Sequence, residues 1–238
     1  MKYMGSKGKV AKYILPIILK DRKPEQWYIE PFAGGMNMID KVDGNRLAND
    51  INPFLIAMWK ELLYGTWRPE YMTKEEYYAI KNNRDKYEPY LVGWAGFNLS
   101  YSGKYFGGYA GIVKTKINTI RDYQKEAINN IKKQIENLKG VTLTNMEYCD
   151  IAIPDHSIIY CDPPYEGTES YSHKFNHPKF WDWCREMKRI GHTIFVSEYN
   201  APSDFIEIWT KEFSSSLSAN GKSGGNKIRK EKLFVLTQ

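Results

Sequence analysis

The chain has 238 residues, of which 42% are hydrophobic, 26% charged and 15% aromatic, and its formal net charge is +6. The length suits one α/β domain or one domain with a large insertion, and the composition is that of an ordinary globular protein. No apolar run is long enough for a membrane span, and the N-terminal "MKYMGSKGKV" lacks the apolar core of a signal peptide, so a membrane protein is excluded and a cytosolic protein is expected.

Cysteine and histidine usage indicates neither a disulfide framework nor a metal site. Cys149, Cys161 and Cys184 form no closely spaced pair, and His173 and His177 have no further ligands at matching spacing. We therefore predict no metal.

The first 65 residues alternate between helical and strand patterns. Residues 9–20 have a helical apolar face interrupted by Pro16, "WYI" and "RLA" are short apolar strands, and "MNMIDKV" can start a helix between them. "PFLIAMWKELLYG" is a further apolar-periodic helix. Such alternation predicts a parallel sheet with helices on its faces.

The character of the chain changes over residues 60–140. Apolar strand patterns are missing, "TKEEYYAIKNNRDKYEPY" is polar with helical period, and "GWAGFNLSYSGKYFGGYAG" is an aromatic, glycine-rich loop. A long amphipathic helix follows and stops at Gly140. Residues 60–139 carry 14 Lys/Arg and 9 Asp/Glu, a balance of +5, so most of the excess positive charge lies here.

After residue 140 the strand–helix alternation returns. "VTLTNM", "SIIYCD" and "HTIFVSEY" are predicted strands, and "HPKFWDWCREMKRIG" is a predicted helix that turns Trp181 and Cys184 to the sheet. "FIEIWTKEF" and "KLFVLTQ" are predicted as a terminal antiparallel pair. We predict a catalytic domain of residues 1–59 and 141–238 that carries an inserted, mainly helical domain of residues 60–140.

A glycine turn, "EPFAGG", follows the first predicted strand, and an aspartate, Asp50, ends the second. Glycines at this place let a ligand approach the backbone, and an acid at the second strand tip can bind ribose hydroxyls. The alternative for Asp50 is a helix cap before "PFLIAMW". Together these features favour a nucleoside-containing cofactor, while "GG" in place of GxGxxG makes a dinucleotide less favoured.

A second strand end is more specific. "IIYC" is followed at once by "DPPY", Asp162 to Tyr165, where two prolines end the strand and hold a carboxylate and an aromatic ring. Open α/β sheets bind their ligands at the carboxyl ends of strands. An Asx-type turn would explain the aspartate and prolines but gives no reason for the tyrosine.

In these motifs the sequence resembles the Dam-type (D12) class of DNA adenine-N6 methyltransferases, particularly phage-encoded members. "KYMGSK", "EPFAGG", "DPPY", "VSEYNAP" and "NKIRKEKLFVL" resemble family segments and occur in family order over nearly the whole chain. The resemblance implies a Rossmann-like methyltransferase sheet, mostly parallel with a C-terminal antiparallel hairpin, and an inserted target-recognition domain at 60–140. It also implies S-adenosylmethionine as the cofactor and double-stranded DNA as the partner.

The resemblance also implies roles for individual residues. The catalytic residues are Asp162, Pro163, Pro164 and Tyr165. The cofactor-binding residues are Tyr3, Lys7, Glu30, Phe32, Ala33, Gly34, Gly35, Asp50, Asp150 and Asp162. The candidate DNA contacts are Lys104, Tyr105, Lys114, Lys116, Arg121 and Arg229, with Tyr101 and Phe106 as further stacking candidates and "SANGKSGG" as a loop that could hold the target strand.

The expected reaction is methyl transfer to the exocyclic N6 of a flipped-out adenine in a specific DNA sequence, with GATC the family's common target. A cytosine-C5 enzyme would need a cysteine nucleophile, usually after proline, and no Pro-Cys occurs. Cytosine N4, RNA adenine and a protein glutamine amide remain alternative substrates, and a non-catalytic DNA-binding protein is the alternative from another class. We expect a monomer, with a dimer on DNA as the alternative, in a bacterial or phage-infected cytoplasm, where restriction–modification is a fitting role.

Overall fold

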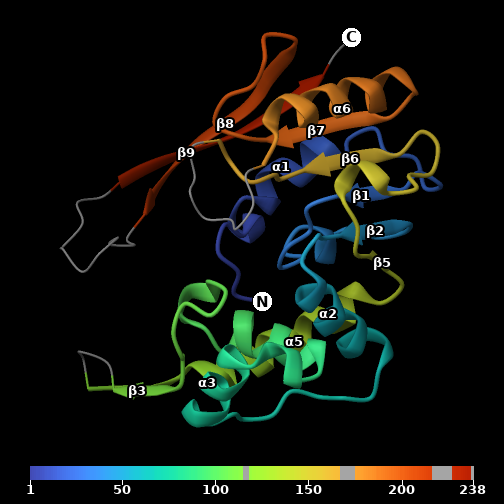
Figure 1. The fold of residues 1–238 in the computed structure, drawn as a ribbon. Helices are drawn as coiled ribbons and strands as arrows, with labels where there is room; N and C mark the ends of the chain where they lie inside the picture. The colour runs from blue at the N-terminus through green and yellow to red at the C-terminus, as the bar shows by residue number, and fades with distance from the viewer. Residues whose placement is uncertain (115–117, 167–174, 216–226, 237–238) are drawn as a thin grey trace. The chain divides into compact units, whose positions relative to one another are not determined.

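The computed structural model describes residues 1–114, 118–166, 175–215 and 227–236 (Figure 1). By their internal contacts these residues form two compact units: unit 1 comprises Met1–Lys12 and Phe32–Ala152, and unit 2 comprises Tyr13–Pro31 and Ile153–Gln238. In the part of the chain that is described, no helix is long and apolar enough to cross a membrane. This grouping places residues 60–140 in unit 1 together with residues 46–49 and 142–144. The separation of 60–140 as a domain of its own stays a prediction.

Seven strands form one sheet, in the order β5-β2-β1-β6-β7-β9-β8. Pairing is parallel for β2 with β5, β1 with β6 and β6 with β7, and antiparallel for β9 with β7 and β8. The strands are β1 Tyr28–Glu30, β2 Arg46–Asn49, β5 Thr142–Thr144, β6 Ile158–Cys161, β7 Thr193–Ser197, β8 Phe205–Ser215 and β9 Lys227–Leu236. The predicted α/β class, with a mostly parallel sheet and a C-terminal antiparallel hairpin, is confirmed.

The short parallel strands are buried because helices cover such a sheet on both faces. Every residue of β1, β2 and β6 is buried. Because every residue of these strands is buried, "YIE", "RLAN" and "IIYC" show no regular alternation of apolar and polar residues.

In unit 1, β2 and β5 run in register from Leu47 opposite Thr142 to Asn49 opposite Thr144. Helix α2 (Pro53–Tyr64) begins directly after β2, because the Asn52 side chain accepts a hydrogen bond from the Leu55 N–H, 3.1 Å away, and a proline follows at the first helical position. The tip of β2 is thereby held between a sheet and a capped helix.

Residues 60–140 are mainly helical, as predicted. They contain α3 (Lys74–Asn82), α4 (Pro89–Gly93), a π-helical turn (Trp94–Asn98) and α5 (Tyr123–Leu138). The apolar face of α5 is buried together with Gln134, whose amide donates to the Gly35 and Met36 carbonyls at 2.9 and 3.0 Å. A polar residue is tolerated there because its donors are satisfied.

Two local predictions were wrong. Residues 60–140 do contain strands, since β3 (Ile112–Lys114) and β4 (Ile120–Asp122) pair as an antiparallel hairpin; its exposed side chains leave no buried-face alternation in the sequence. "MNMIDKV" forms only a 3₁₀ turn, Ile39–Lys41, because the chain becomes extended at the next residue, Val42, with φ −114° and ψ 132°.

In unit 2, the cross-sheet register matches Tyr28 to Ile158 and Cys161 to Val196. Helix α1 (Ala11–Ile18) contains Pro16. Its first two residues are grouped with unit 1 and the others with unit 2. Helix α6 (His177–Arg189) is capped by Asn176, and its buried face includes the predicted Trp181 and Cys184. The unit therefore carries three parallel strands whose carboxyl ends meet at one sheet edge.

Candidate active site

The glycine turn and Asp50 are joined directly in unit 1. The Gly34 N–H donates to Oδ2 of Asp50, and the Asn52 N–H donates to Oδ1, each at 2.9 Å. The Ala33 N–H also donates to the Asn49 carbonyl at 2.8 Å. Burial raises the pKa of the Asp50 carboxyl, and the two N–H groups oppose that rise. The cap of α2 is Asn52, so Asp50 is not the cap itself but the link between the turn and the helix start.

Tyr3 lies against the two glycines. A Cβ at Gly34 would come within 2.7 Å of Tyr3 Cε1, and one at Gly35 would come within 2.7 Å of Tyr3 Cβ. Gly34 also has a φ of +48°, which disfavours other residues. The structure therefore brings together Tyr3, Gly34, Gly35 and Asp50, which the sequence analysis assigned to one ligand.

The structure places the other predicted cofactor residues of unit 1 as follows. Lys7 begins a 3₁₀ turn, Lys7–Lys9, and is 8% exposed. The Phe32 ring packs at 5.3 Å on Tyr148, the residue that starts the 3₁₀ turn leading to the exposed Asp150. Asn145 donates to the Asp50 carbonyl at 2.7 Å, which ties the segment after β5 to the segment after β2.

The "DPPY" segment follows β6 in unit 2. Cys161 and Pro163 are buried, whereas Asp162, Pro164 and Tyr165 are partly exposed. The Tyr165 hydroxyl donates to Glu231 at 3.3 Å. Burial, and then the nearby Asp162 carboxylate, raise the pKa of the Tyr165 phenol well above its ordinary value, so this hydroxyl stays protonated at neutral pH.

Two buried glutamates stand at the neighbouring strand ends. Glu30, at the end of β1, is 3% exposed and accepts from the Tyr28 hydroxyl at 3.0 Å. It lies in unit 2, whereas the glycine turn that follows it in sequence lies in unit 1. Glu198, directly after β7, is 1% exposed and accepts a hydrogen bond from the Glu166 N–H at 2.7 Å. The sequence analysis assigned Glu30 but gave no role to Glu198.

The model of the D12 class of N6 adenine-specific DNA methyltransferases matches residues 3–215, which include the glycine turn, Asp50 and the "DPPY" segment. The chain belongs to this family. The predicted resemblance is thereby confirmed. Among solved structures, the chain is similar to the crystal structure of SMU.472, a protein assigned as a methyltransferase, complexed with SAH. That alignment has a TM-score of 0.37 and 12% identity, and it covers 97% of this chain and 52% of that one, so this chain spans about half of that protein's length.

The DNA candidates of this D12 family member differ in exposure. Lys104 and Lys114 are exposed. Arg121 is exposed too, but its guanidinium pairs with Glu126 at 2.6 Å and lies 4.5 Å from the Tyr123 ring centre. The other candidates are placed as follows: Tyr101 is 60% exposed, Tyr105 is partly buried, Phe106 is 6% exposed, and Lys116, the "SANGKSGG" loop and the side chain of Arg229 lie outside the described residues.

Exposed apolar side chains mark two places that the sequence analysis missed in this D12 chain. Ile51 is 57% exposed directly after Asp50, and the hairpin carries Ile112 and Ile120, which are 62% and 78% exposed. A large apolar residue directly after a predicted strand-end acid was the available signal for Ile51. The β3–β4 hairpin offered no such signal in the sequence, because its side chains are exposed on both faces.

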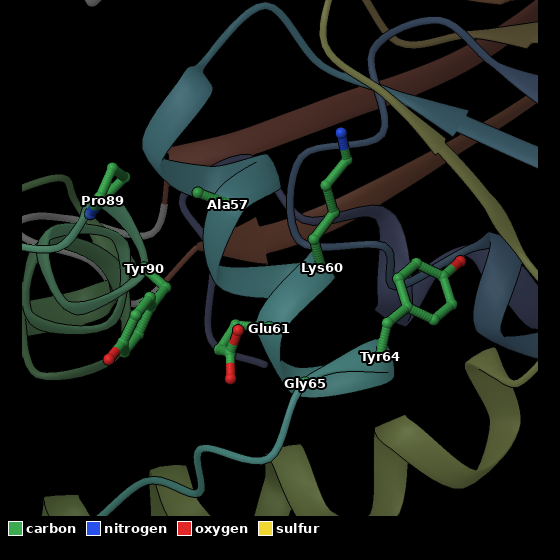
Figure 2. A pocket seen from close by; sticks show the side chains of 7 residues that line it. All are labelled: Ala57, Lys60, Glu61, Tyr64, Gly65, Pro89 and Tyr90. Atoms are coloured by element: carbon green, nitrogen blue, oxygen red, sulfur yellow. The ribbon is translucent and has the colours of Figure 1, made fainter.

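A pocket of about 460 Å³ lies beside α2 (Figure 2). It is lined by Ala57, Lys60, Glu61, Tyr64, Gly65, Pro89 and Tyr90. None of the residues predicted for cofactor, catalysis or DNA lines it, so we assign it no part in the D12 reaction.

Proposed function

We propose that this chain transfers a methyl group from S-adenosylmethionine to the exocyclic N6 of a flipped-out adenine in double-stranded DNA. The observation that carries this proposal is the placement of "DPPY" at the end of a buried parallel strand, in a chain that belongs to the D12 family. There Asp162 and Tyr165 reach the surface while Pro163 is held in the core.

Unit 1 has the features needed to hold the cofactor. Positions 34 and 35 of the turn favour glycine, because a Cβ there would come within 2.7 Å of Tyr3. We assign the methionine part to the turn and Tyr3, the ribose to Asp50, and an apolar face of the adenine to Ile51, while Lys7 and Asp150 supply polar contacts. The bound cofactor supplies a methyl group on a positively charged sulfur, activated for transfer.

The chemistry falls to unit 2. The adenine amine is a poor nucleophile because its lone pair is delocalised into the ring. The Asp162 carboxylate and the Pro163 carbonyl accept hydrogen bonds from its two N–H groups and localise that lone pair on nitrogen. With the cofactor bound, a nitrogen–carbon bond would form as the carbon–sulfur bond breaks, S-adenosylhomocysteine would leave as the thioether, and the methylated amine would lose one proton to solvent.

Two further features support direct transfer from an extruded base. Tyr165 offers a ring for stacking, which contributes about 1–3 kcal/mol per base in single-strand binding, and a base must leave the duplex to reach an enclosed site. A cysteine nucleophile is not needed. Burial raises the pKa of the Cys161 thiol, the cysteine nearest the motif in sequence, so it is not a thiolate at neutral pH.

Residues 60–140 are proposed as the DNA-recognition region. The exposed hairpin combines Lys114, which can bind phosphate, with the apolar Ile112 and Ile120, which can enter a base step. GATC is the first sequence to test. We propose action as a monomer, with a dimer on DNA as the alternative, in a bacterial or phage-infected cytoplasm, where protection against restriction is a fitting role.

The experiment that tests this function incubates the protein with plasmid DNA and methyl-labelled S-adenosylmethionine and then digests the DNA to nucleosides. We expect the label in N6-methyladenine alone. Label in N4-methylcytosine, or in RNA but not DNA when both are offered, would contradict the proposal. Sequencing the methylated DNA then gives the recognition site.

A further inference from the structure

Glu198 is a buried carboxylate that the reaction described above does not use. It is 1% exposed and lies directly after β7, the strand paired in parallel with β6. No described Lys or Arg forms an ion pair with it. Burying a carboxylate without a cation is costly unless its oxygens accept hydrogen bonds.

The two oxygens of Glu198 accept from two different backbone segments. Oε1 accepts from the Glu166 N–H at 2.7 Å, and Oε2 accepts from the N–H of its neighbour, Tyr199. A neutral side chain with a single acceptor oxygen could satisfy only one of these donors. A carboxyl group with two acceptor oxygens therefore fits this position; burial raises its pKa, and the Glu166 and Tyr199 N–H groups oppose that rise.

Both segments held by Glu198 contact Tyr165. Glu166 is the next residue along the chain, so fixing its N–H fixes the backbone where the Tyr165 ring begins. The Tyr199 ring packs edge-on against the Tyr165 ring, with centres 4.6 Å apart and planes at 83°. The Tyr165 hydroxyl is held separately, by Glu231 at 3.3 Å.

We propose that Glu198 is a positioning residue of the methyl transfer: through the Glu166 N–H and the Tyr199 ring, it sets the plane of the Tyr165 ring on which the flipped base stacks. This inference rests on the proposed function, in which Tyr165 stacks on the target adenine. The hydrogen bond from the Glu166 N–H explains why the Glu198 carboxylate is buried beside the "DPPY" segment, although that segment carries the acidic Asp162. A mobile ring would let the base move, and a misplacement of about 1 Å can cost on the order of 100-fold in rate.

The test compares Glu198→Gln, Glu198→Ala, Tyr199→Phe and Tyr199→Ala with the wild type. We expect kcat to fall in Glu198→Ala by about tenfold or more, and by less in Glu198→Gln, which keeps one acceptor. Tyr199→Phe should keep the wild-type rate because the ring remains, whereas Tyr199→Ala should lose it.

The dissociation constant for S-adenosylmethionine should stay within about twofold in all four variants, because Glu198 and Tyr199 are not cofactor residues in the proposed function. Glu186→Gln, in an exposed ion pair on α6, is the matched control.

A spectroscopic readout separates positioning from general stability. The probe is 2-aminopurine at the adenine position that the wild type methylates. Stacking in the wild type should quench the emission of the extruded base, whereas Glu198→Ala should give brighter emission per bound DNA, toward the value of Tyr165→Ala.

Wild-type kcat and emission in folded Glu198→Ala, or equal rates in both Tyr199 variants, would overturn the inference. If Glu198→Ala does not fold, Glu198→Gln and the Tyr199 pair decide it. If the wild type makes no N6-methyladenine, the proposed function fails. If the wild type makes it and the Glu198 and Tyr199 variants match its rate and emission, only the inference about Glu198 fails.

Discussion

Asp50 shows what a single residue contributes in this fold. The sequence places an acid at the end of a strand, which is enough to predict a ligand contact. The structure adds that both its oxygens accept backbone N–H groups, from Gly34 and Asn52. The carboxylate thus shapes the glycine turn, and the remaining lone pairs on each oxygen can still accept from a ribose.

The glycine turn gives the first prediction. Gly34→Ala should weaken S-adenosylmethionine binding, because its Cβ would lie 2.7 Å from the Tyr3 ring. The matched control is Gly140→Ala, which shares a positive φ of +81° but has no atom within 4 Å. Both variants should lose about 1–2 kcal/mol of unfolding free energy from backbone strain. Calorimetry should show lost cofactor affinity in Gly34→Ala alone; equal affinity in the two would contradict the assignment of the turn.

Ile51 gives the second prediction. If it covers an apolar face of the cofactor, Ile51→Ser should raise the dissociation constant for S-adenosylmethionine about 5- to 20-fold, since burying a large aliphatic side chain contributes about 1.5–3 kcal/mol and the contact covers part of it. The control is Ile206→Ser, in β8, where the isoleucine is similarly exposed at 50%. Equal affinities in both variants would remove Ile51 from the cofactor site.

At the scale of elements, the β3–β4 hairpin is the part that the sequence did not reveal. Burial creates the alternation by which a strand is recognised, and a strand exposed on both faces has none. The same exposure makes the hairpin available to a partner. Helix α5, by contrast, was predictable because its apolar positions are buried at helical spacing.

The hairpin gives the third prediction. Lys114→Ala should weaken binding to any DNA sequence and should reduce the slope of log affinity against log salt by about 0.9, the value for one phosphate contact. Lys23→Ala removes an exposed lysine of unit 2 and should leave the slope unchanged. Filter binding over a salt series measures both, and an unaltered slope for Lys114→Ala would exclude a phosphate contact there.

At the scale of the whole molecule, the sequence predicted the seven strands of the main sheet in chain order, the parallel pairing, the antiparallel terminal pair and the family. These rest on buried strand runs and on strand-end motifs, which are local in sequence. The division into units was not predictable: Glu30 and Gly34 are four residues apart but belong to different units, because the grouping depends on contacts between distant segments. The role of Glu198 was hidden for the same reason, since its donor on Glu166 is 32 residues away.

Acid stability gives the fourth prediction. Hydrogen bonds from Arg121 and then from Lys2 hold the pKa of Glu126 at about 2, below its ordinary 4.5. A depressed carboxyl pKa contributes stability that is present above about 4.5 and is lost as the pH falls toward 2. Because the side chains of Lys2 and Glu126 are about one-third exposed and that of Arg121 is 47% exposed, screening limits the effect to no more than about 1 kcal/mol. Urea denaturation at pH 7 and pH 3 should show Glu126→Gln less stable than wild type at pH 7 and nearer to it at pH 3. A difference that grows on acidification would contradict the pairing.

The central claim is that Asp162 activates the amine that is methylated. The most direct test is single-turnover methyl transfer to DNA by wild type and Asp162→Ala, with cofactor and DNA binding measured on the same preparations. We predict that Asp162→Ala forms no N6-methyladenine above background, even at S-adenosylmethionine and DNA concentrations that saturate its measured binding. Transfer by Asp162→Ala at the wild-type rate would contradict the mechanism.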